Sequence, residues 1–539
     1  MPLVAVPSVS KAKHEEAEVA RAEAPELREV TWWKDPGLRR LYALCAVVCL
    51  ASATTGYDGS MLNGLQILPI WQTSFNNPHG SLLGLFGSIY SIGSLAGLPV
   101  APYIADHYGR KKAIWLGCLI LFVGVACQSA AQNFKMFVAS RFFVGFGCTL
   151  SQLSSPLLLT EICHPQHRGR VTAVYNCLWN VGAIVATWYA GSSRVQAYIR
   201  HIQHQERVGV AHPVNPAGIP SLIQFSLLFL VPESPRWLVS KDRGQEALKV
   251  LAKYHANGDE QDETVLFEYA EIKETLRLEL VAKKTSSYLD FVKTKGNRYR
   301  LFLIATAGLF SQWSGNGLTS YYFSKVMDSI GITDTNTQFE INGCLTILSL
   351  IISVSCAFLI DKIGRRPLFL AATTGMLICF TLWTICVALF DQGNKAAGKA
   401  VVAFIWLHSA TYAFAWSGLL VAYTVEIMPF KIRAKGLMLM NFFVQVALVF
   451  NQYINPIGLD NITPKWKFYV IYCVWIAVEL TVVYFFYIET KGPTLEEIAK
   501  IFDGEDAAVG IADIAEIKGD IKTEVVEIED VGITTQSKA

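Results

Sequence analysis

The sequence predicts an all-α membrane protein in which twelve membrane-spanning helices form two halves of six. Three observations support this fold class. The 539 residues are 52% hydrophobic and only 17% charged, a balance typical of polytopic membrane proteins. Apolar segments of spanning length recur along the chain, and a hydrophilic block near the middle divides them into two sets. Charged motifs with the same spacing occur in both sets, which indicates that the halves repeat one plan.

The spans follow from segment length and hydropathy. A bilayer core about 30 Å thick needs about 20 apolar residues in a helix. Segments of that length lie at 41–63, 81–104, 113–132, 136–159, 170–191, 299–323, 341–360, 367–390, 400–425, 436–454 and 467–488. A twelfth segment, 218–231, is shorter. The expected organisation is a tail (1–40), a six-helix half (41–231), a linker with short helices (232–298), a second six-helix half (299–488) and an acidic tail (489–539).

The loops predict the orientation of the protein. Basic residues such as Arg110, Arg168 and Lys431 gather after the second, fourth, eighth and tenth spans, whereas the loop at 64–80 has no Lys or Arg. Cytoplasmic loops of membrane proteins carry the excess of Lys and Arg. We therefore expect both termini and the linker to be cytoplasmic, in a multi-pass protein of the plasma membrane that contacts the lipid bilayer.

Two motifs occur once in each half. DHYGRKK (106–112) follows the second span and DKIGRRP (361–367) follows the eighth, while a Glu precedes an Arg by seven residues after the fourth and tenth spans. Matched motifs in two similar halves are typical of an alternating-access transporter with its substrate site between the halves. We predict a cytoplasmic ion-pair gate that breaks when the protein opens inward. Its residues are Asp106, Gly109, Arg110, Glu161, Arg168, Asp361, Gly364, Arg365, Glu426 and Arg433.

The composition argues against several other functions. A net charge of +2 lacks the basic excess of a nucleic-acid-binding surface, so no nucleic-acid partner is expected. The twelve cysteines are scattered and form no CxxC pair, which favours packing over metal binding. The chain has no Walker loop and no HExxH motif. We therefore expect no enzyme activity, no catalytic residues, no metal and no cofactor.

The chain resembles the sugar porter family of the major facilitator superfamily over residues 40–500. Besides the repeated Asp-x-x-Gly-Arg motifs, the resemblance rests on Arg141 opening RFFVGFG, on PESPRWL (232–238) and on ETKGPTLEE (489–497). It implies the major facilitator fold and the transport of a sugar. FSQWSGNGLTSYY (310–322) and INGCLTILSLI (341–351) resemble the fungal branch of lactose permeases and cellobiose transporters. That branch implies a disaccharide substrate, with a hexose as the alternative.

The resemblance also implies where the sugar binds. The position of Asn176 is one where the family commonly has a sugar-binding glutamine, and Gln312 matches the second glutamine of a seventh-span pair. The sugar-binding candidates are Asn176, Gln312, Asn316, Tyr321, Tyr322, Trp416 and Asn441, with Tyr412, Asn451 and Gln452 as further polar residues near them. The chain departs from the family where SGNG replaces GIN and where GPxPW is absent. A packing role is the alternative for each residue.

Asp58 in GYDG lies near the end of the first span, where a carboxylate is costly unless it is paired, protonated or hydrated. In proton-coupled members of the family this aspartate faces a fourth-span arginine, here Arg141. The resemblance therefore implies that protons and a sugar are the partners of a symporter, and we expect it to act as a monomer. The alternatives are a sugar uniporter, in which Asp58 pins helix packing, and a non-transporting sugar sensor.

The sixth span is the weak place in the expected fold. The chain keeps IPSLIQ and VPESPRWL but lacks the Trp-Arg entry that the family has before this span. Pro213 and Pro216 oppose an extension of the helix toward the N-terminus. Two explanations compete: a true variant, or a reading frame with a retained intron. We favour the second and expect the natural transcript to encode a longer sixth span.

Overall fold

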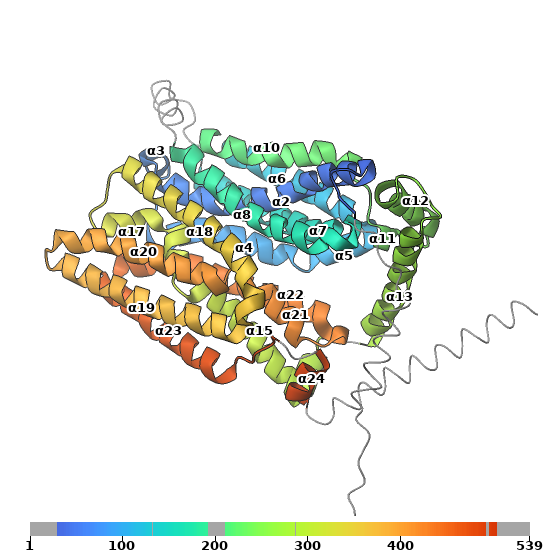
Figure 1. Cartoon of the computed structure of the whole chain (residues 1–539). Coiled ribbons are helices and arrows are strands. Elements are labelled where there is room, and N and C mark those ends of the chain that lie inside the picture. The colour runs from blue at the N-terminus through green and yellow to red at the C-terminus, as the bar shows by residue number, and fades with distance from the viewer. Residues whose placement is uncertain (1–29, 132, 192–210, 286, 492–494, 504–539) are drawn as a thin grey trace, which may run out of the picture.

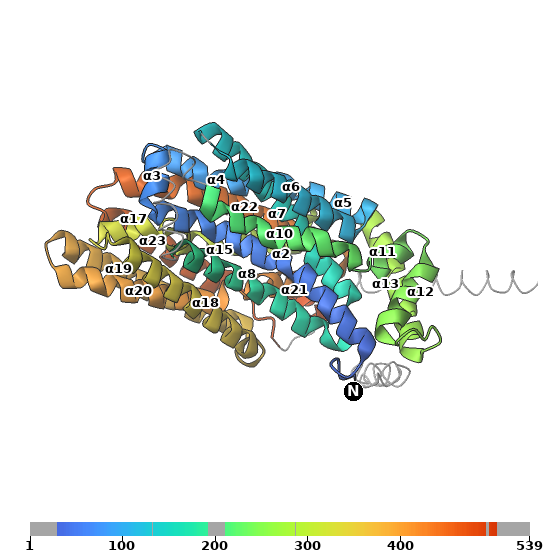
Figure 2. The ribbon, with the colours of Figure 1, turned by 90° about the horizontal axis from the view of Figure 1, so that it is seen from above.

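The computed structural model describes residues 30–131, 133–191, 211–285, 287–491 and 495–503. Every regular element in these ranges is helical. Figure 1 shows two groups of long helices, with the first half of the chain above the second and a cluster of short helices beside them. Figure 2 shows the same short helices at one end of the bundle. We call that end the linker end and the opposite end the far end.

The first half contains the helices of six expected spans. They are α2 (Pro36–Ile67), α4 (Gly80–Gly97) with α5 (Val100–Tyr108), α6 (Arg110–Ser129), α7 (Phe134–Ile162), α8 (Arg168–Gly191) and α10 (Ala211–Leu227). Side-chain caps mark two of their starts: Asp35 accepts the amide of Gly37 at the beginning of α2, and Asn133 accepts the amide of Met136 in α7. Such caps satisfy amides that have no partner inside the helix.

The second half repeats this order with more interruptions. Its helices are α15 (Lys295–Trp313), α16 (Asn316–Tyr321), α17 (Phe323–Ser329), α18 (Thr335–Ile363), α19 (Arg365–Asp391), α20 (Lys395–Ala415), α21 (Leu419–Ile427), α22 (Phe430–Asn461) and α23 (Trp466–Phe486). Between the halves, α4 packs against α22 and α8 packs against α18. The second and fifth spans of one half therefore face the fifth and second spans of the other.

Short helices cover the linker end. The linker forms α11 (Pro235–Ser240), α12 (Gly244–His255), α13 (Glu263–Thr285) and α14 (Asp290–Lys293). The part of the C-terminal tail that the structure describes forms α24 (Leu495–Asp503), which packs against α15. Arg300 of α15 is fully buried and holds the Asp503 carboxylate with two bonds of 2.8 and 2.7 Å. This part of the acidic tail is thus docked on the second half.

The structure differs from the predicted spans at the seventh. Nine helices among the described residues are long and apolar enough to cross a membrane, and the predicted spans at 170–191 and 299–323 are not among them. The helix α8 covers the first of these without a break. The second was expected as one helix and is divided into α15, α16 and α17. The break comes at Gly315, whose φ of +88° favours glycine.

The sixth span also differs from its prediction. The helix α10 begins at Ala211 and includes Pro213 and Pro216, which we had expected to prevent such an extension. Pro213 lies in the first helical turn, where a missing amide hydrogen leaves no helix bond unmade. A short 3-10 helix, η2 (Leu228–Leu230), completes the span, and its apolar part remains short at Gly218–Leu230. Residues 192–210, which carry the basic stretch before it, lie outside the described ranges.

Candidate functional site

An arginine and a glutamate pair at the linker end of each half. In the first half, Arg110 donates to Glu161 with bonds of 3.0 and 3.3 Å. In the second, Arg365 donates to Glu426 with bonds of 2.9 and 3.2 Å. All four side chains are largely buried, at 10–24% exposed. The repeated motifs of the sequence therefore occupy equivalent places in the two halves.

A glycine with positive φ precedes each of these arginines. Gly109 has φ of +108° and Gly364 has φ of +106°, a region that strongly favours glycine. A Cβ atom on Gly109 would lie 2.6 Å from the Glu233 carboxylate, and one on Gly364 would lie 2.8 Å from the Glu489 carboxylate. Glycine is therefore needed twice, for the turn and for the close approach of a glutamate.

Two glutamates complete these networks, and our sequence-based gate omitted both. The Glu233 carboxylate accepts the amide of Lys111 at 3.2 Å, and the Glu489 carboxylate accepts the amides of Arg365 at 2.9 Å and Arg366 at 3.1 Å. Burial raises the pKa of Glu233, although these amide bonds oppose the shift. The signal that would have found them is the shared Glu in PESPRWL and ETKG, each directly after the last span of a half.

The arginines seven residues after Glu161 and Glu426 bond backbone carbonyl groups and not these glutamates. Arg168 donates to the Cys163 carbonyl at 3.4 Å, and Arg433 donates to the Met428 carbonyl at 3.3 Å. Each therefore holds the loop that follows its glutamate-bearing helix. Asp106 lies 3.4 Å from Arg110, one helical turn away. Its counterpart Asp361 belongs to α18, but its side chain is outside the described part of the structure.

Asp58 and Arg141 lie buried in adjacent helices of the first half. They belong to α2 and α7 and are 1% and 2% exposed. Among the described residues the two groups make no ion pair: the Cys148 thiol lies 3.5 Å from Asp58 Oδ2, and the Arg141 guanidinium lies over the Tyr90 ring at 5.2 Å. Asp58 Oδ1 and Arg141 Nε and Nη1 have no hydrogen-bond partner there. The charge of Arg141 is still near enough to act on Asp58.

The break between α15 and α16 exposes carbonyl groups that other helices bind. The Tyr412 hydroxyl donates to the Ser311 carbonyl at 2.7 Å, and the Asn451 amide donates to the Gln312 carbonyl. His408 Nε2 lies 2.9 Å from the Ser314 carbonyl. Irregular backbone at membrane depth persists where side chains or a polar cavity satisfy it, and it often marks a binding site.

The predicted sugar-binding residues fall into two sets. Gln312 and Asn316 flank the break and are half-buried, with Tyr412 and Asn451 beside them. The other set is spread through the protein. Asn176 is exposed on α8, and Tyr321 is half-buried. Tyr322 is buried and its hydroxyl bonds the Gln452 carbonyl, while Trp416 is buried with its Nε1 3.2 Å from Thr373 Oγ1. Asn441 bonds the Leu437 carbonyl of its own helix.

Amide side chains join the two halves toward the far end. Asn63 of α2 donates to the Thr319 carbonyl at 3.4 Å and accepts the amide of Phe323 at 3.2 Å. Gln66, one turn later, donates to the Tyr321 carbonyl at 2.9 Å. Both amides therefore bind backbone of the broken seventh span. We did not single them out from the sequence, although polar amides within an apolar span often join helices.

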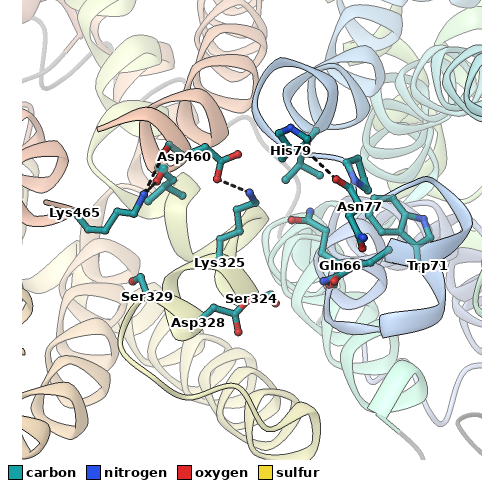
Figure 3. A pocket seen from close by; sticks show the side chains of 14 residues that line it. Gln66, Trp71, Asn77, His79, Ser324, Lys325, Asp328, Ser329, Asp460 and Lys465 are labelled. Atoms are coloured by element: carbon teal, nitrogen blue, oxygen red, sulfur yellow. Dashed lines mark hydrogen bonds and ion pairs between the residues drawn. The ribbon is translucent and has the colours of Figure 1, made fainter. Parts of the chain in front are cut away.

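A cavity of about 540 Å³, lined by both polar and apolar residues, lies at the far end between the halves. Figure 3 shows Lys325 and Asp460 side by side in its wall, with Gln66, Trp71, Asn77 and His79 across from them. Lys325 Nζ lies 2.6 Å from Asp460 Oδ1. The other oxygen, Asp460 Oδ2, accepts the amide of Gly80 at 2.6 Å. Asp460 thus connects its own half with the first residue of α4 in the other half.

Comparisons with known proteins agree with this architecture. The sequence profile of the family described as "Sugar (and other) transporter" matches residues 44–502. The chain is 26% identical to "High-affinity glucose transporter 1" of Candida albicans, with 87% of each chain covered. It is 28% identical to "High glucose sensor RGT2" of Saccharomyces cerevisiae, with 83% of this chain and 58% of the sensor covered.

A solved structure shares the fold. The xylose transporter XylE from E. coli, solved in an inward open conformation, superposes with a TM-score of 0.70 at 21% identity, with 86% of this chain and 100% of that chain covered. The predicted major facilitator fold is confirmed. The chain belongs to the sugar porters of the major facilitator superfamily, a family of multi-pass membrane transporters.

Proposed function

We propose that this chain imports a sugar together with a proton by exposing one binding site alternately to the two sides of the membrane. The observation that carries the proton part is the burial of Asp58 and Arg141 in adjacent helices without an ion pair. A carboxyl group inside a membrane protein marks a functional site, because an isolated charge there is costly. A proton on Asp58 would remove that cost.

Loss of the proton would then move a helix. A charged Asp58 attracts the Arg141 guanidinium, which favours a closer approach of α2 and α7. The helix α2 also holds the seventh span through Asn63 and Gln66, so a shift of α2 acts on the far-end contacts. Proton binding and sugar binding would favour each other, and this coupling is reciprocal.

The orientation follows from the charge of the loops. With the linker end in the cytoplasm, the far-end bonds of Asn63, Gln66 and Asp460 close the protein toward the outside. The Arg110–Glu161 and Arg365–Glu426 pairs join helices within their own halves. The far-end bonds therefore support a carrier that is closed to the outside, with the predicted gate pairs still formed within each half.

The sugar site that the geometry favours lies at the break of the seventh span. Gln312 and Asn316 supply amide groups, and Tyr412 adds an aromatic ring with a hydroxyl group. Sugar recognition needs several hydrogen-bond groups and an apolar ring face, which this set combines. Asn176, Tyr321, Tyr322, Trp416 and Asn441 complete the proposed set from the sequence. The substrate we propose is a disaccharide of the lactose or cellobiose type, or a hexose.

Uptake by a yeast strain that lacks its own sugar transporters tests this function. We propose a monomer in the plasma membrane and expect accumulation of lactose, cellobiose or glucose above the external concentration, faster at acidic external pH. Sugar addition should also make an unbuffered medium alkaline, because a proton enters with each sugar. Uptake without accumulation or alkalinisation would indicate a uniporter. Correct surface expression without uptake of any of the three sugars would favour a sensor.

A further inference from the structure

The helix α23 carries a carboxyl group in its interior that the proposed function does not use. Glu479 is 0% exposed and lies in the apolar run VWIAVELTVV. It makes no ion pair with any Lys or Arg that the structure describes. Among the described residues its Oε1 atom makes no hydrogen bond of normal geometry, although the indole of Trp475, one turn earlier on α23, lies near enough to act on the carboxyl group. A buried carboxylate with neither a cation nor a full set of donors is strongly unfavourable, so this surrounding favours the protonated acid.

The other charged groups are far along the neighbouring helices. The helix α19 packs along α23 and has no charged residue between Arg366 and Asp391, only the thiols of Cys379 and Cys386. The seventh span has none between Arg300 and Lys325. The titratable groups that act on Glu479 are Tyr412 of α20, Tyr472 of α23 and Tyr487 just after it, and His408 of α20 lies on the Ser314 carbonyl.

One hydroxyl group connects Glu479 to the break in the seventh span. Ser314 Oγ lies 2.9 Å from Glu479 Oε2 and 2.5 Å from the Phe310 carbonyl. A serine hydroxyl has a single proton, so it donates to only one of these two acceptors. If it donates to Phe310, the contact with Glu479 requires a proton on the carboxyl group. If Glu479 is charged, Ser314 donates to it and the Phe310 carbonyl loses its bond.

A histidine binds the backbone carbonyl group of the same serine. His408 is 0% exposed, its Nε2 lies 2.9 Å from the Ser314 carbonyl, and its Nδ1 has no partner among the described residues. The carbonyl accepts, so the hydrogen is on Nε2 and the bare Nδ1 can accept a proton. Ser314 is thus bound by α20 and α23 at the residue before Gly315, where the helix breaks.

We propose that Glu479 is a second proton-binding site of this carrier and lies in its second half. The hydroxyl of Ser314, at the break of the seventh span, changes its hydrogen-bond partner when Glu479 gains or loses the proton. The proposal rests on the proposed transport function, since the break carries the sugar candidates Gln312 and Asn316. When the proton leaves for water in the transport path, Ser314 turns its hydrogen from Phe310 to the carboxylate. The last turn of α15 then loses a bond, which favours a change of angle at the break.

Infrared spectroscopy of the purified carrier in lipid nanodiscs tests this proposal without any need for transport. We expect a C=O stretch of a buried protonated carboxyl group that Glu479→Gln removes and Asp58→Asn leaves in place. We also expect this band of the normal protein to decrease as pH rises or on sugar addition, because either would remove the proton. The Asp58→Asn spectrum separates this site from the one on which the proposed symport depends.

Three results would overturn the proposal. The band of the normal protein and that of Glu479→Gln could be identical, which would show that Glu479 is not protonated. The band could be present but unaffected by pH and sugar, which would make Glu479 a fixed structural acid. If Glu479→Gln fails to fold, Glu479→Asp takes its place, and an unshifted band in that variant counts against the proposal. Loss of accumulation in Asp58→Asn alone bears on the symport and not on Glu479.

Discussion

The Arg110 guanidinium donates to both carboxylate oxygens of Glu161, at 3.0 and 3.3 Å, and so joins the start of α6 to the end of α7. The second half repeats this bond between Arg365 and Glu426. Hydrogen bonds to charged groups are worth about 1.5–3 kcal/mol each. Two such pairs, each within one half, stiffen the linker end of that half, and the gate that we propose requires them to rearrange when the carrier changes sides.

Removal of either arginine should slow transport. We expect Arg110→Ala or Arg365→Ala to reduce the maximal uptake rate by about tenfold or more, in line with the loss of a charged hydrogen bond. The protein should still reach the membrane, which a fluorescent fusion reports. Arg110→Lys keeps the charge but cannot make both bonds, so its maximal uptake rate should lie between those of the normal protein and Arg110→Ala. Unchanged maximal uptake in both alanine variants would show that these pairs are not a gate.

Replacement of Asp58 by an amide should separate transport from proton coupling. Asp58→Asn is expected to abolish sugar accumulation against a gradient while sugar exchange across the membrane continues, since an amide cannot release a proton. Arg141→Ala should weaken the same coupling. Cys148→Ala is the matched control, because it removes the thiol that contacts Asp58 without a change in charge. Accumulation by Asp58→Asn would make Asp58 structural and the protein a uniporter.

Loss of the Asp460 charge should loosen the far end. Asp460→Asn weakens the bonds to Lys325 and to the Gly80 amide, so the outward-open state should be visited more often. A cysteine in place of the buried Thr319 should then react several times faster with a membrane-impermeant maleimide on intact cells. Asp328→Asn is the control, because Asp328 lines the same cavity but bonds Gln338 of its own half. Equal labelling rates in all three proteins would contradict the far-end lock.

The tail helix should contribute to stability through one buried pair. Arg300→Ala leaves the Asp503 carboxylate without its partner and should destabilise the protein by about 3 kcal/mol, the usual result of breaking a buried ion pair. Asp503→Asn should have a smaller effect of the same sign. The Lys293–Asp290 pair is the comparison, because its lysine is exposed, and Lys293→Ala should change the melting temperature little. Similar melting temperatures for Arg300→Ala and Lys293→Ala would show that α24 is not docked in solution.

Acid should weaken the linker end through a histidine. Burial, followed by the repulsion of His255, lowers the pKa of His164 to about 4 from an unfolded value of about 6.5. A histidine with a depressed pKa stabilises the fold above the unfolded pKa, and this contribution is lost as pH falls from about 6.5 toward about 4. We therefore expect His164→Phe to melt with a weaker pH dependence in this window. His107→Phe, at an exposed position, should keep the dependence of the normal protein.

Much of the architecture could be predicted from the sequence, because membrane insertion is decided locally. An apolar run of spanning length is recognised within that run, so the helices around Asp58 and Arg141 were expected where they lie, whereas the span expected at 400–425 is interrupted at Trp416. The places of Gly109 and Gly364 could also be predicted without tertiary information, because the same motif with glycine at its turn occurs in both halves of the sequence. The same repeat predicted that Arg110 and Glu161 belong to one cytoplasmic network, but it did not predict that Glu161 bonds Arg110 rather than Arg168.

Only the tertiary structure decided which distant groups meet. The seventh span reads as one continuous apolar segment, yet it breaks at Gly315 because Tyr412, Asn451 and His408 bind the carbonyl groups that the break frees. Likewise, Glu479 has a partner in Ser314 only because α23 packs beside the break, 165 residues away in sequence. Hydropathy is a property of a segment, whereas a hydrogen bond between helices depends on their packing angle and register. No pattern within a single helix encodes those.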